Sequence, residues 1–338
     1  MIKKPYFIAE ISGNHEGSLK KVLRLMSEIK KIKADAVKFQ TFKAERMSPN
    51  INRKDVIVDN QNSPWHKKNL YSIYKKTEVP ENWYKKIFEY GKKINLEVFS
   101  SPFSVEDVDF LEKFNVKFYK IASLENTNYE LLKKIANTGK KIIISTGTAS
   151  KKELIKSINI LKKNGAKKII ILKCITGYPS KPKDYNLKTL IDMKKIFNCQ
   201  VGVSDHTLSD IVPITSLHYG GEFIEKHICL KRKKKGIDSF YSQEVQEFKS
   251  LIKNCNESLE AIGKPNYGNT KAEKLSKKRR RILYTIKNVK KNDLVDNKNI
   301  IGLRGGEGIS INLKKSIEGK KFLKNLKKYT KLNTKHFN

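Results

Sequence analysis

The chain has 338 residues, with 71 lysines and arginines against 34 aspartates and glutamates, which gives a formal net charge of +37. The lysines are spread over almost every predicted helix face, and no nucleic-acid-binding motif accompanies the densest basic runs, 231–235 and 277–281. The charge therefore does not indicate a nucleic-acid-binding protein. No apolar stretch approaches the roughly 18 residues of a membrane span. The length predicts one large domain of about 250 residues and a smaller second one.

The four cysteines indicate a reducing compartment. Cys174, Cys199, Cys229 and Cys255 show no CxxC pairing, and we expect reduced, partly buried thiols. The first predicted strand begins at Tyr6, which leaves no room for a signal peptide. We therefore expect a cytoplasmic protein.

Eight short apolar runs follow one another along most of the chain, and nearly every one ends in a polar residue capable of chemistry. The runs are 6–9, 36–37, 98–99, 118–119, 142–144, 169–172, 201–203 and 223–224. The polar residues at their ends are Glu10, His15, Lys38, Gln40, Ser100, Ser101, Lys120, Ser123, Ser145, Lys173, Cys174, Ser204, Asp205, His206, Glu225, Lys226 and His227. This pattern is typical of an eight-stranded parallel (β/α)8 TIM barrel, in which reactive residues gather at the C-terminal ends of the strands.

The segments between the runs favour the same architecture. Residues 20–32, 106–114, 129–136, 152–162 and 245–261 carry apolar residues at i, i+3, i+4 and i+7, the period of a helix that covers a sheet. Alternating strands and helices predict a parallel sheet. A doubly wound open sheet remains the alternative, although its crevice would not need reactive residues from all eight strands.

Two regions fall outside the alternating pattern. Residues 43–80 form a long piece without a clear period, and loops of this length in a compact domain are usually functional. After residue 265 the pattern changes to a polar stretch, 266–280, and then to short β-like runs with turns. We therefore predict a barrel domain over residues 1–265, a linker over 266–280 and a small, mostly β module over 281–338, near the lower size limit for independent folding.

The predicted mouth of the barrel combines imidazoles, ammonium groups and hydroxyls. His206 and His227 end two neighbouring strands, so together they are candidates to hold a divalent metal, with Asp238 as a possible partner. Lys38 and Lys120 point into the same mouth, where they could form a Schiff base or neutralise an anion. The ring of serines favours the anion: Ser101, Ser123, Ser145 and Ser204. The predicted ligand is a small dianion with carboxylate and phosphate groups beside a metal.

A set of short motifs, taken in order, is similar to one family. The motifs are Ile8-Ala9-Glu10, Asn14-His15-Glu16-Gly17-Ser18, Lys38-Phe39-Gln40-Thr41, Ser101-Pro102-Phe103, Tyr119-Lys120-Ile121-Ala122-Ser123, Ser145-Thr146-Gly147, Tyr178-Pro179, Ser204-Asp205-His206-Thr207 and Glu225-Lys226-His227. They resemble the sialic acid synthase family, whose members condense phosphoenolpyruvate with an N-acetylated sugar aldehyde. The resemblance covers essentially the whole chain, and residues 281–338 resemble the family's antifreeze-like SAF (β-clip) domain.

The resemblance implies a role for each candidate residue. His206 and His227 would hold Mn²⁺, with Mg²⁺ or Co²⁺ as alternatives, and Asp238 would order the water shell of the metal. Glu125 or Glu16 would handle a proton. Arg304 would reach the N-acyl group of the sugar from the partner subunit of a domain-swapped homodimer. The residues implied to bind substrates are Lys38, Gln40, Ser101, Lys120, Ser123, Ser145, Thr176, Tyr178, Ser204 and Arg304.

Further segments distinguish branches within the family: Lys38-Phe39-Gln40-Thr41, Asn69-Leu70-Tyr71, Ser123-Leu124-Glu125-Asn126-Thr127, Gly236-Ile237-Asp238-Ser239 and Tyr267-Gly268-Asn269-Thr270. By these segments the chain resembles the pseudaminic acid synthase branch most. This implies condensation with 2,4-diacetamido-2,4,6-trideoxy-L-altrose to give pseudaminic acid. Glu16 and the segment Cys174-Ile175-Thr176-Gly177-Tyr178 depart from that branch, so N-acetylneuraminate synthase and legionaminate synthase remain alternatives. A Schiff-base aldolase that uses Lys120 and a catalytically dead sugar-binding or nucleic-acid-binding relative are the alternatives from other classes.

Overall fold

The computed structural model describes residues 4–61, 63–268 and 270–338. The chain divides into two compact units, Met1–Ile262 and Gly263–Asn338. In the first unit eight parallel strands pair in sequence order, and β1 also pairs with β8, so the sheet closes on itself. The strands are β1 (Tyr6–Glu10), β2 (Ala36–Thr41), β3 (Glu97–Pro102), β4 (Phe118–Ile121), β5 (Lys141–Ser145), β6 (Ile169–Cys174), β7 (Gln200–Asp205) and β8 (Phe223–Cys229). The predicted parallel barrel is confirmed, and the open sheet is excluded.

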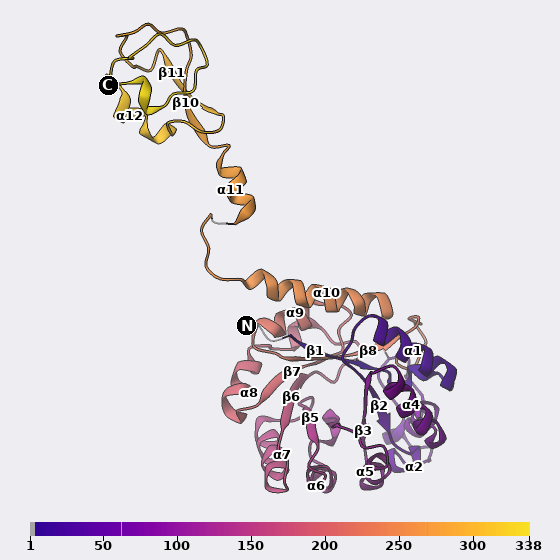
Figure 1. The fold of residues 1–338 in the computed structure, drawn as a ribbon. Coiled ribbons are helices and arrows are strands. Elements are labelled where there is room, and N and C mark those ends of the chain that lie inside the picture. Colours follow the sequence, from indigo (N-terminus) through magenta and orange to yellow (C-terminus); the bar gives the residue numbers. More distant parts are fainter. Residues whose placement is uncertain (1–3, 62, 269) are drawn as a thin grey trace. The chain divides into compact units, whose positions relative to one another are not determined.

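Helices surround the barrel on its outside (Figure 1). They are α1 (Leu19–Lys31), α4 (Glu81–Lys93), α5 (Val105–Glu112), α6 (Tyr129–Asn137), α7 (Lys151–Lys163), α8 (Thr189–Phe197), α9 (Ile211–His218) and α10 (Val245–Ile262). Local sequence sets where they begin. For example, Ser150 and Glu153 form a reciprocal capping box at the start of α7, and the same helix buries Leu154, Ile158 and Leu161. The five helices predicted from apolar periodicity are confirmed.

Side chains fill the barrel instead of leaving a pore. Ile8, Ala36, Phe99, Phe118, Ile143, Ile170, Leu172 and Phe223 form one buried cluster. A larger cluster contains residues of the strands together with residues of the surrounding helices, such as Val22, Leu25 and Met26 of α1. The residues of this interior cluster show which positions of each strand face into the barrel. None of the helices in the described part of the chain is long and apolar enough to cross a membrane.

The segment predicted as irregular, 43–80, contains regular structure. It holds α2 (Ala44–Met47), a 3-10 turn at Lys54–Val56 and α3 (Leu70–Thr77). An isolated antiparallel bridge between Ile57 and Asn69 connects the two halves of the segment. Helices this short bury too few residues to give a clear apolar period, which is why the sequence pattern did not reveal them.

The second unit has its own small core. β10 (Arg281–Thr285) pairs antiparallel with β11 (Ile300–Arg304), and isolated antiparallel bridges such as Val289 to Leu326 extend the pairing. The buried residues include Leu283, Val295, Phe322 and Leu332. A short helix, α11 (Lys271–Lys277), begins at a Thr270–Glu273 capping box within the stretch predicted as a linker; Asn269 in the same stretch lies outside the described residues.

Candidate functional site

The strand period places the functional side chains in the barrel mouth. Side chains two residues apart on a strand point to the same face. Ile8, Phe99, Phe118, Ile143 and Phe223 point into the barrel, so the residues two positions later also face inward, above the apolar plug. These residues are Glu10, Ser101, Lys120, Ser145 and Glu225, and Ala36 positions Lys38 in the same way.

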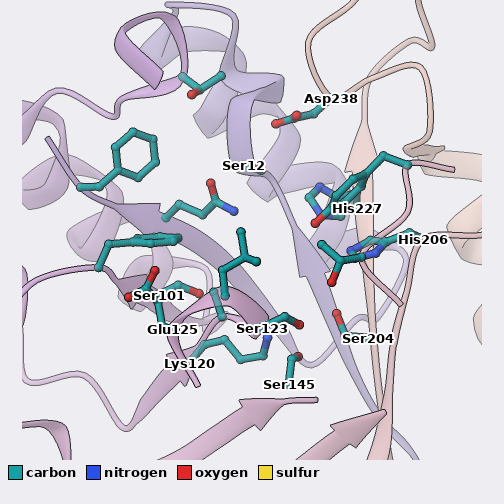
Figure 2. Close-up of a pocket in the computed structure, with 18 of the residues that line it drawn as sticks. Ser12, Ser101, Lys120, Ser123, Glu125, Ser145, Ser204, His206, His227 and Asp238 are labelled. Atoms are coloured by element: carbon teal, nitrogen blue, oxygen red, sulfur yellow. The ribbon is translucent and has the colours of Figure 1, made fainter. Parts of the chain in front are cut away.

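A cavity of about 400 Å³ lies at this end of the barrel. Its lining includes thirteen of the predicted site residues, which the structure therefore brings together: Lys38, Gln40, Ser101, Lys120, Ser123, Glu125, Ser145, Thr176, Tyr178, Ser204, His206, His227 and Asp238. Figure 2 shows His206, His227 and Asp238 along one side, with Lys120, Ser123 and Ser145 at the bottom of the view. The cavity thus has an imidazole side and an ammonium-and-hydroxyl side.

Four buried charged groups form the floor of the site. Lys38 Nζ lies 2.5 Å from Glu10 Oε2 and 3.7 Å from Glu225 Oε1. Lys120 Nζ lies 3.3 Å from the same Glu225 oxygen, which also accepts a hydrogen bond from Ser204 Oγ at 3.1 Å. Each of the four side chains is at most 5% exposed. Two ammonium groups and two carboxylates therefore balance one another away from water.

The environment shifts the pKa values of these groups in different directions. Burial raises the pKa of Glu10 to about 7, although the neighbouring Lys38 opposes the shift. Burial alone would lower the pKa of Lys38, but the carboxylates of Glu10 and Glu225 raise it overall. Burial lowers the pKa of Lys120 in spite of the nearby Glu225. Glu225 is buried too, yet the two lysines hold its pKa below the usual range.

Two hydroxyls and one carboxylate oxygen in the cavity lining have no hydrogen-bond partner among the described residues. Ser145 Oγ and Thr176 Oγ1 are buried without a hydrogen bond, and so is Oε2 of Glu225. Buried polar atoms without partners are costly unless something else pairs with them. Two lysines and two free hydroxyls together therefore provide donors for an anionic ligand with several oxygens.

The two predicted metal ligands lie side by side. The ring centroids of His206 and His227 are 5.4 Å apart. His206 Nδ1 lies 2.8 Å from the carbonyl oxygen of Ile175, so this nitrogen must be the donor and Nε2 is left for another contact. Burial, together with the neighbouring His206, lowers the pKa of His227 well below its usual value, which favours the neutral form that a metal ligand must have. Burial alone would lower the pKa of His206 as well, but the adjacent Cys174 raises it.

The imidazole pair fits a metal that takes most of its ligands from outside the chain. Among the described residues, no group of three or more His, Cys, Asp or Glu side chains is arranged to hold a metal ion. Asp238 lines the cavity, but its Oδ2 accepts a hydrogen bond from the Gly13 amide at 2.6 Å. Tyr178 and Tyr241 enclose the imidazoles, with ring centroids 4.4 Å from His206 and 4.8 Å from His227, respectively. Substrate and water oxygens would have to complete the coordination.

The structure places the two predicted proton-handling carboxylates differently. Glu125 lines the cavity, and burial raises its pKa. Glu16 is exposed on the surface and is not among the residues that line the cavity. It pairs with Lys21 at 2.6 Å and with Lys233 at 2.7 Å, and these charges hold its pKa low although partial burial opposes them. Arg304 lies in the second unit, exposed at the end of β11.

Some residues of the site had no role predicted from the sequence. Glu10 and Glu225 follow short apolar runs in the same pattern as the lysines, so that pattern could have identified them as partners. Ser12, Trp65 and Tyr241 also line the cavity, but they come from loops, and no periodic signal marks a loop residue that folds over a barrel mouth.

A model described as the NeuB family matches residues 25–267 of the chain. The chain belongs to the NeuB family. It is 35% identical over 334 residues to a pseudaminic acid synthase of Helicobacter pylori, which covers 98% of this chain and 97% of that protein. It is 34% identical over 338 residues to an N,N'-diacetyllegionaminic acid synthase of Campylobacter jejuni, which covers 96% of this chain and 98% of that one.

Solved structures show the same fold. The crystal structure of an N-acetylneuraminic acid synthetase from Leptospira borgpetersenii in complex with citrate matches with a TM-score of 0.70 at 28% identity, over 81% of this chain and 90% of that chain. The family assignment made from the ordered motifs is confirmed, because the NeuB family model and relatives above 30% identity agree on it.

Proposed function

We propose that the protein is a pseudaminic acid synthase, which condenses phosphoenolpyruvate with 2,4-diacetamido-2,4,6-trideoxy-L-altrose and water to give pseudaminic acid and phosphate. One observation carries the proposal: a cavity with two buried lysines and unpaired hydroxyls opposite two imidazoles, in a chain that is 35% identical to a pseudaminic acid synthase over almost its full length. The 34% identity to a legionaminic acid synthase keeps 2,4-diacetamido-2,4,6-trideoxymannose as the second candidate sugar.

Phosphoenolpyruvate would occupy the floor of the cavity. Its carboxylate and phosphate need several donors, which Lys38, Lys120, Ser145, Ser204 and Thr176 supply. Binding this anion between the lysines adds negative charge beside Glu10, whose pKa is already raised to about 7 by burial. We therefore expect Glu10 to be protonated when phosphoenolpyruvate is bound.

His206 and His227 would hold a divalent ion, Mn²⁺ in our proposal, with Mg²⁺ and Co²⁺ as alternatives. Such an ion supplies Lewis-acid polarisation of the sugar aldehyde when it is bound. The chain itself holds the imidazole of His206 in place: the Ile175 carbonyl fixes its tautomer, and the Tyr178 ring packs against it at a tilt of 43°.

The reaction balances with groups already at the site. The enol carbon C3 of phosphoenolpyruvate forms a bond with C1 of the sugar aldehyde, and the aldehyde oxygen takes a proton. A water molecule adds at C2 and gives up one proton to a carboxylate, which balances the proton taken by the aldehyde oxygen. When the C2–O bond to phosphate then breaks, the remaining hydroxyl proton passes to the leaving phosphate and C2 becomes the keto carbon. The cavity-lining Glu125, with a pKa raised by burial, suits the role of proton acceptor better than the exposed Glu16.

We further propose that the second unit is an SAF domain that completes the active site of a partner subunit in a domain-swapped homodimer. Arg304 is exposed at the end of β11, directly before Gly305 and Gly306, and its guanidinium would donate to the N-acyl carbonyl of the sugar. Mixing Arg304→Ala subunits with His206→Ala subunits tests this: activity should return in heterodimers confirmed by mass. The absence of complementation would exclude the shared site. The four free cysteines suit a reducing compartment, which we take to be the cytoplasm.

Phosphate release from phosphoenolpyruvate, measured with a panel of sugars, tests the proposed reaction. We expect turnover with the L-altro trideoxy sugar to exceed turnover with the trideoxymannose and with N-acetylmannosamine. A preference for either of the last two would replace pseudaminic acid with legionaminic or N-acetylneuraminic acid as the product. Trapping of the enzyme by borohydride with substrate, together with activity that survives EDTA, would instead support a Schiff-base aldolase.

A further inference from the structure

The cavity has an apolar wall that the proposed chemistry does not use. We define the apolar wall as the six side chains Phe42, Met47, Leu70, Ile73, Tyr74 and Phe103, all of which line the cavity. The Phe42 ring lies with its centroid 5.7 Å from Tyr74 and 5.5 Å from Phe103, edge to face in both cases. Apart from one thioether and one phenolic hydroxyl, these side chains present only carbon.

Helix α3 contributes to the wall with one face. Leu70, Ile73, Tyr74 and Thr77 are spaced i, i+3, i+4 and i+7, and all four line the cavity. This spacing places them on a single side of the helix. Ile73 is only 8% exposed, so a change of its side chain alters the wall itself and not the outer surface of the protein.

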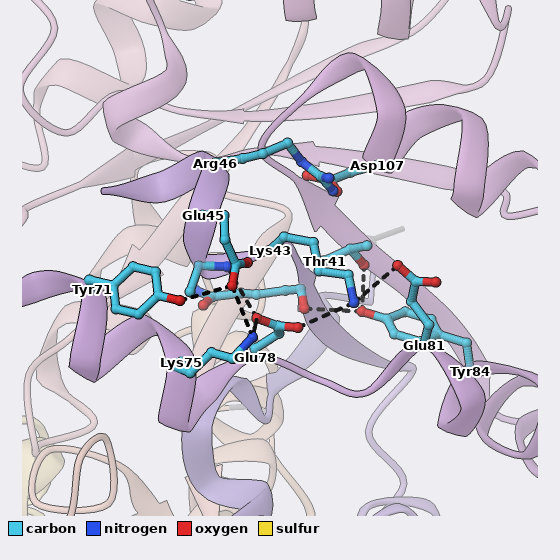
Figure 3. A network of polar contacts seen from close by, with 12 residues as sticks. Thr41, Lys43, Glu45, Arg46, Tyr71, Lys75, Glu78, Glu81, Tyr84 and Asp107 are labelled. Carbon is cyan, nitrogen blue, oxygen red and sulfur yellow. Dashed lines mark hydrogen bonds and ion pairs between the residues drawn. The ribbon is translucent and has the colours of Figure 1, made fainter. Parts of the chain in front are cut away.

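A polar clamp holds the opposite face of α3 (Figure 3). We define the clamp as Lys43, Glu45, Tyr71, Lys75 and Glu78. Glu45 accepts hydrogen bonds from Tyr71 Oη at 2.9 Å and from Lys75 Nζ at 3.1 Å. Glu78 accepts from Lys43 Nζ at 3.2 Å and from the Ala44 amide at 3.1 Å. The clamp links α3 to α2 and to the end of β2, so the apolar face is held against the cavity.

The position of the wall indicates which part of a sugar it meets. Residues of the strands, such as Lys38, Lys120 and Ser145, form the floor, where phosphoenolpyruvate would bind. The wall comes from segments that follow β2 and β3 in the chain, beyond the strand ends. The aldehyde carbon C1 of the sugar must approach C3 of phosphoenolpyruvate, so C1 lies near the floor. The other end of the open chain, C6, lies five bonds away and reaches toward the wall.

We propose that the apolar wall selects a sugar whose carbon chain ends in a methyl group and rejects the equivalent sugar that ends in a hydroxymethyl group. A methyl group gains from contact with buried carbon, whereas a hydroxyl group against the wall loses its hydrogen bonds with water. The inference rests on the proposed condensation reaction, but it is independent of whether the sugar has the altro or the manno configuration.

The test compares two sugars that differ only by the C6 hydroxyl: 2,4-diacetamido-2,4,6-trideoxy-L-altrose and 2,4-diacetamido-2,4-dideoxy-L-altrose. We expect the unmodified full-length enzyme to favour the first by up to about 100-fold in kcat/KM for phosphate release, the range reported for pockets that discriminate a single hydroxyl. Ile73→Thr replaces a methyl-bearing carbon of the wall with a hydroxyl, and it should reduce this preference by about 5-fold or more. Leu70→Thr is a second variant for the case that Ile73→Thr does not fold.

The preference is a ratio within one enzyme preparation, so partial loss of folded protein does not change it. Lys76→Gln, an exposed position on α3, is the matched control and should leave the ratio unchanged. A ratio near 1 in the unmodified enzyme, or the same ratio in Ile73→Thr and Leu70→Thr as in the unmodified enzyme, would overturn the inference.

The proposed function is judged by a separate comparison. If the manno trideoxy sugar is the better substrate, pseudaminic acid is wrong as the product, and the C6 comparison is made with the manno pair. Failure of the unmodified enzyme to turn over any of these sugars would overturn the proposed function and, with it, the inference that rests on it.

Discussion

Removal of the ammonium group of Lys38 tests whether the buried charges at the floor depend on one another. Lys38 pairs with Glu10 at 2.5 Å, and the two side chains are 4% and 1% exposed. Lys38→Met leaves Glu10 and Glu225 with Lys120 as their remaining cation. Breaking a buried ion pair by removing one partner typically destabilises a protein by about 3–5 kcal/mol.

The pKa of Glu10 places the expected loss at the low end of this range. Because burial already raises that pKa to about 7, the orphaned carboxylate can take up a proton near neutral pH at little cost. We therefore expect Lys38→Met to lower the free energy of unfolding by about 3 kcal/mol at pH 7. Glu10→Gln in the same chain should recover part of this loss, with a coupling energy of about 2 kcal/mol between the two substitutions.

Urea unfolding followed by tryptophan fluorescence provides the measurement. Both tryptophans, Trp65 and Trp83, belong to the first unit, so the signal follows the barrel and not the second unit. Lys20→Met, at an exposed position on α1, is the control and should change the free energy of unfolding by less than about 0.5 kcal/mol. Strictly additive effects of Lys38→Met and Glu10→Gln would refute the coupled floor.

Three further predictions concern the same site. His206→Ala or His227→Ala should abolish phosphate release without changing the free energy of unfolding measured by tryptophan fluorescence, because loss of the metal site removes several kcal/mol of transition-state stabilisation. Near-normal turnover of either variant in metal-free buffer would show that the two imidazoles do not form a metal site. Lys120→Met should raise the KM for phosphoenolpyruvate more than the KM for the sugar, because one charge-assisted contact is worth about 1.5–3 kcal/mol, and a rise in the sugar KM alone would show that the anion site is misassigned. The raised pKa of Glu10 adds free energy of unfolding that is fully present below about pH 4.5 and is lost as the pH rises through about 7. Between about pH 5 and about pH 8, the free energy of unfolding should therefore fall less in Glu10→Gln than in the unmodified protein. Urea unfolding at each pH measures this difference.

The fold was predictable because periodicity and strand-end chemistry repeat eight times. Each apolar run marked a strand of the barrel, and the residue at its end marked the mouth. Lys38, Lys120 and His227 were assigned to the mouth by this rule alone, and the structure places all three in the lining of one cavity. Because the same pattern occurs on every strand of a closed barrel, few other folds would bring these strand-end residues together.

The contacts within the site were less predictable from the sequence. They depend on which buried side chains pair with one another at the floor and on how the loops fold. No sequence signal shows that one Glu225 oxygen lies near Lys38, Lys120 and Ser204. Glu16 stands inside a motif that resembles the family, Asn14-His15-Glu16-Gly17-Ser18. The backbone makes a left-handed turn at this residue just before α1 begins, and its side chain pairs with Lys21 and Lys233 on the surface. The wall on α3 lies in a helix of 8 residues, whose single set of i, i+3 and i+4 apolar residues is too short to stand out in the sequence around it.

The central claim is that the enzyme condenses phosphoenolpyruvate with the sugar by addition of water at C2 and cleavage of the C2–O bond. Following the oxygen atom that bridges C2 and phosphorus tests this claim most directly. Phosphoenolpyruvate labelled with oxygen-18 in the bridge between C2 and phosphorus is incubated with the enzyme and 2,4-diacetamido-2,4,6-trideoxy-L-altrose, and both products are analysed by mass spectrometry. If water adds at C2 and phosphate leaves with the bridging oxygen, the label appears in the phosphate and the new keto acid carries solvent oxygen. Label retained in the keto acid would show that the bond to phosphorus breaks instead, which would contradict the proposed condensation.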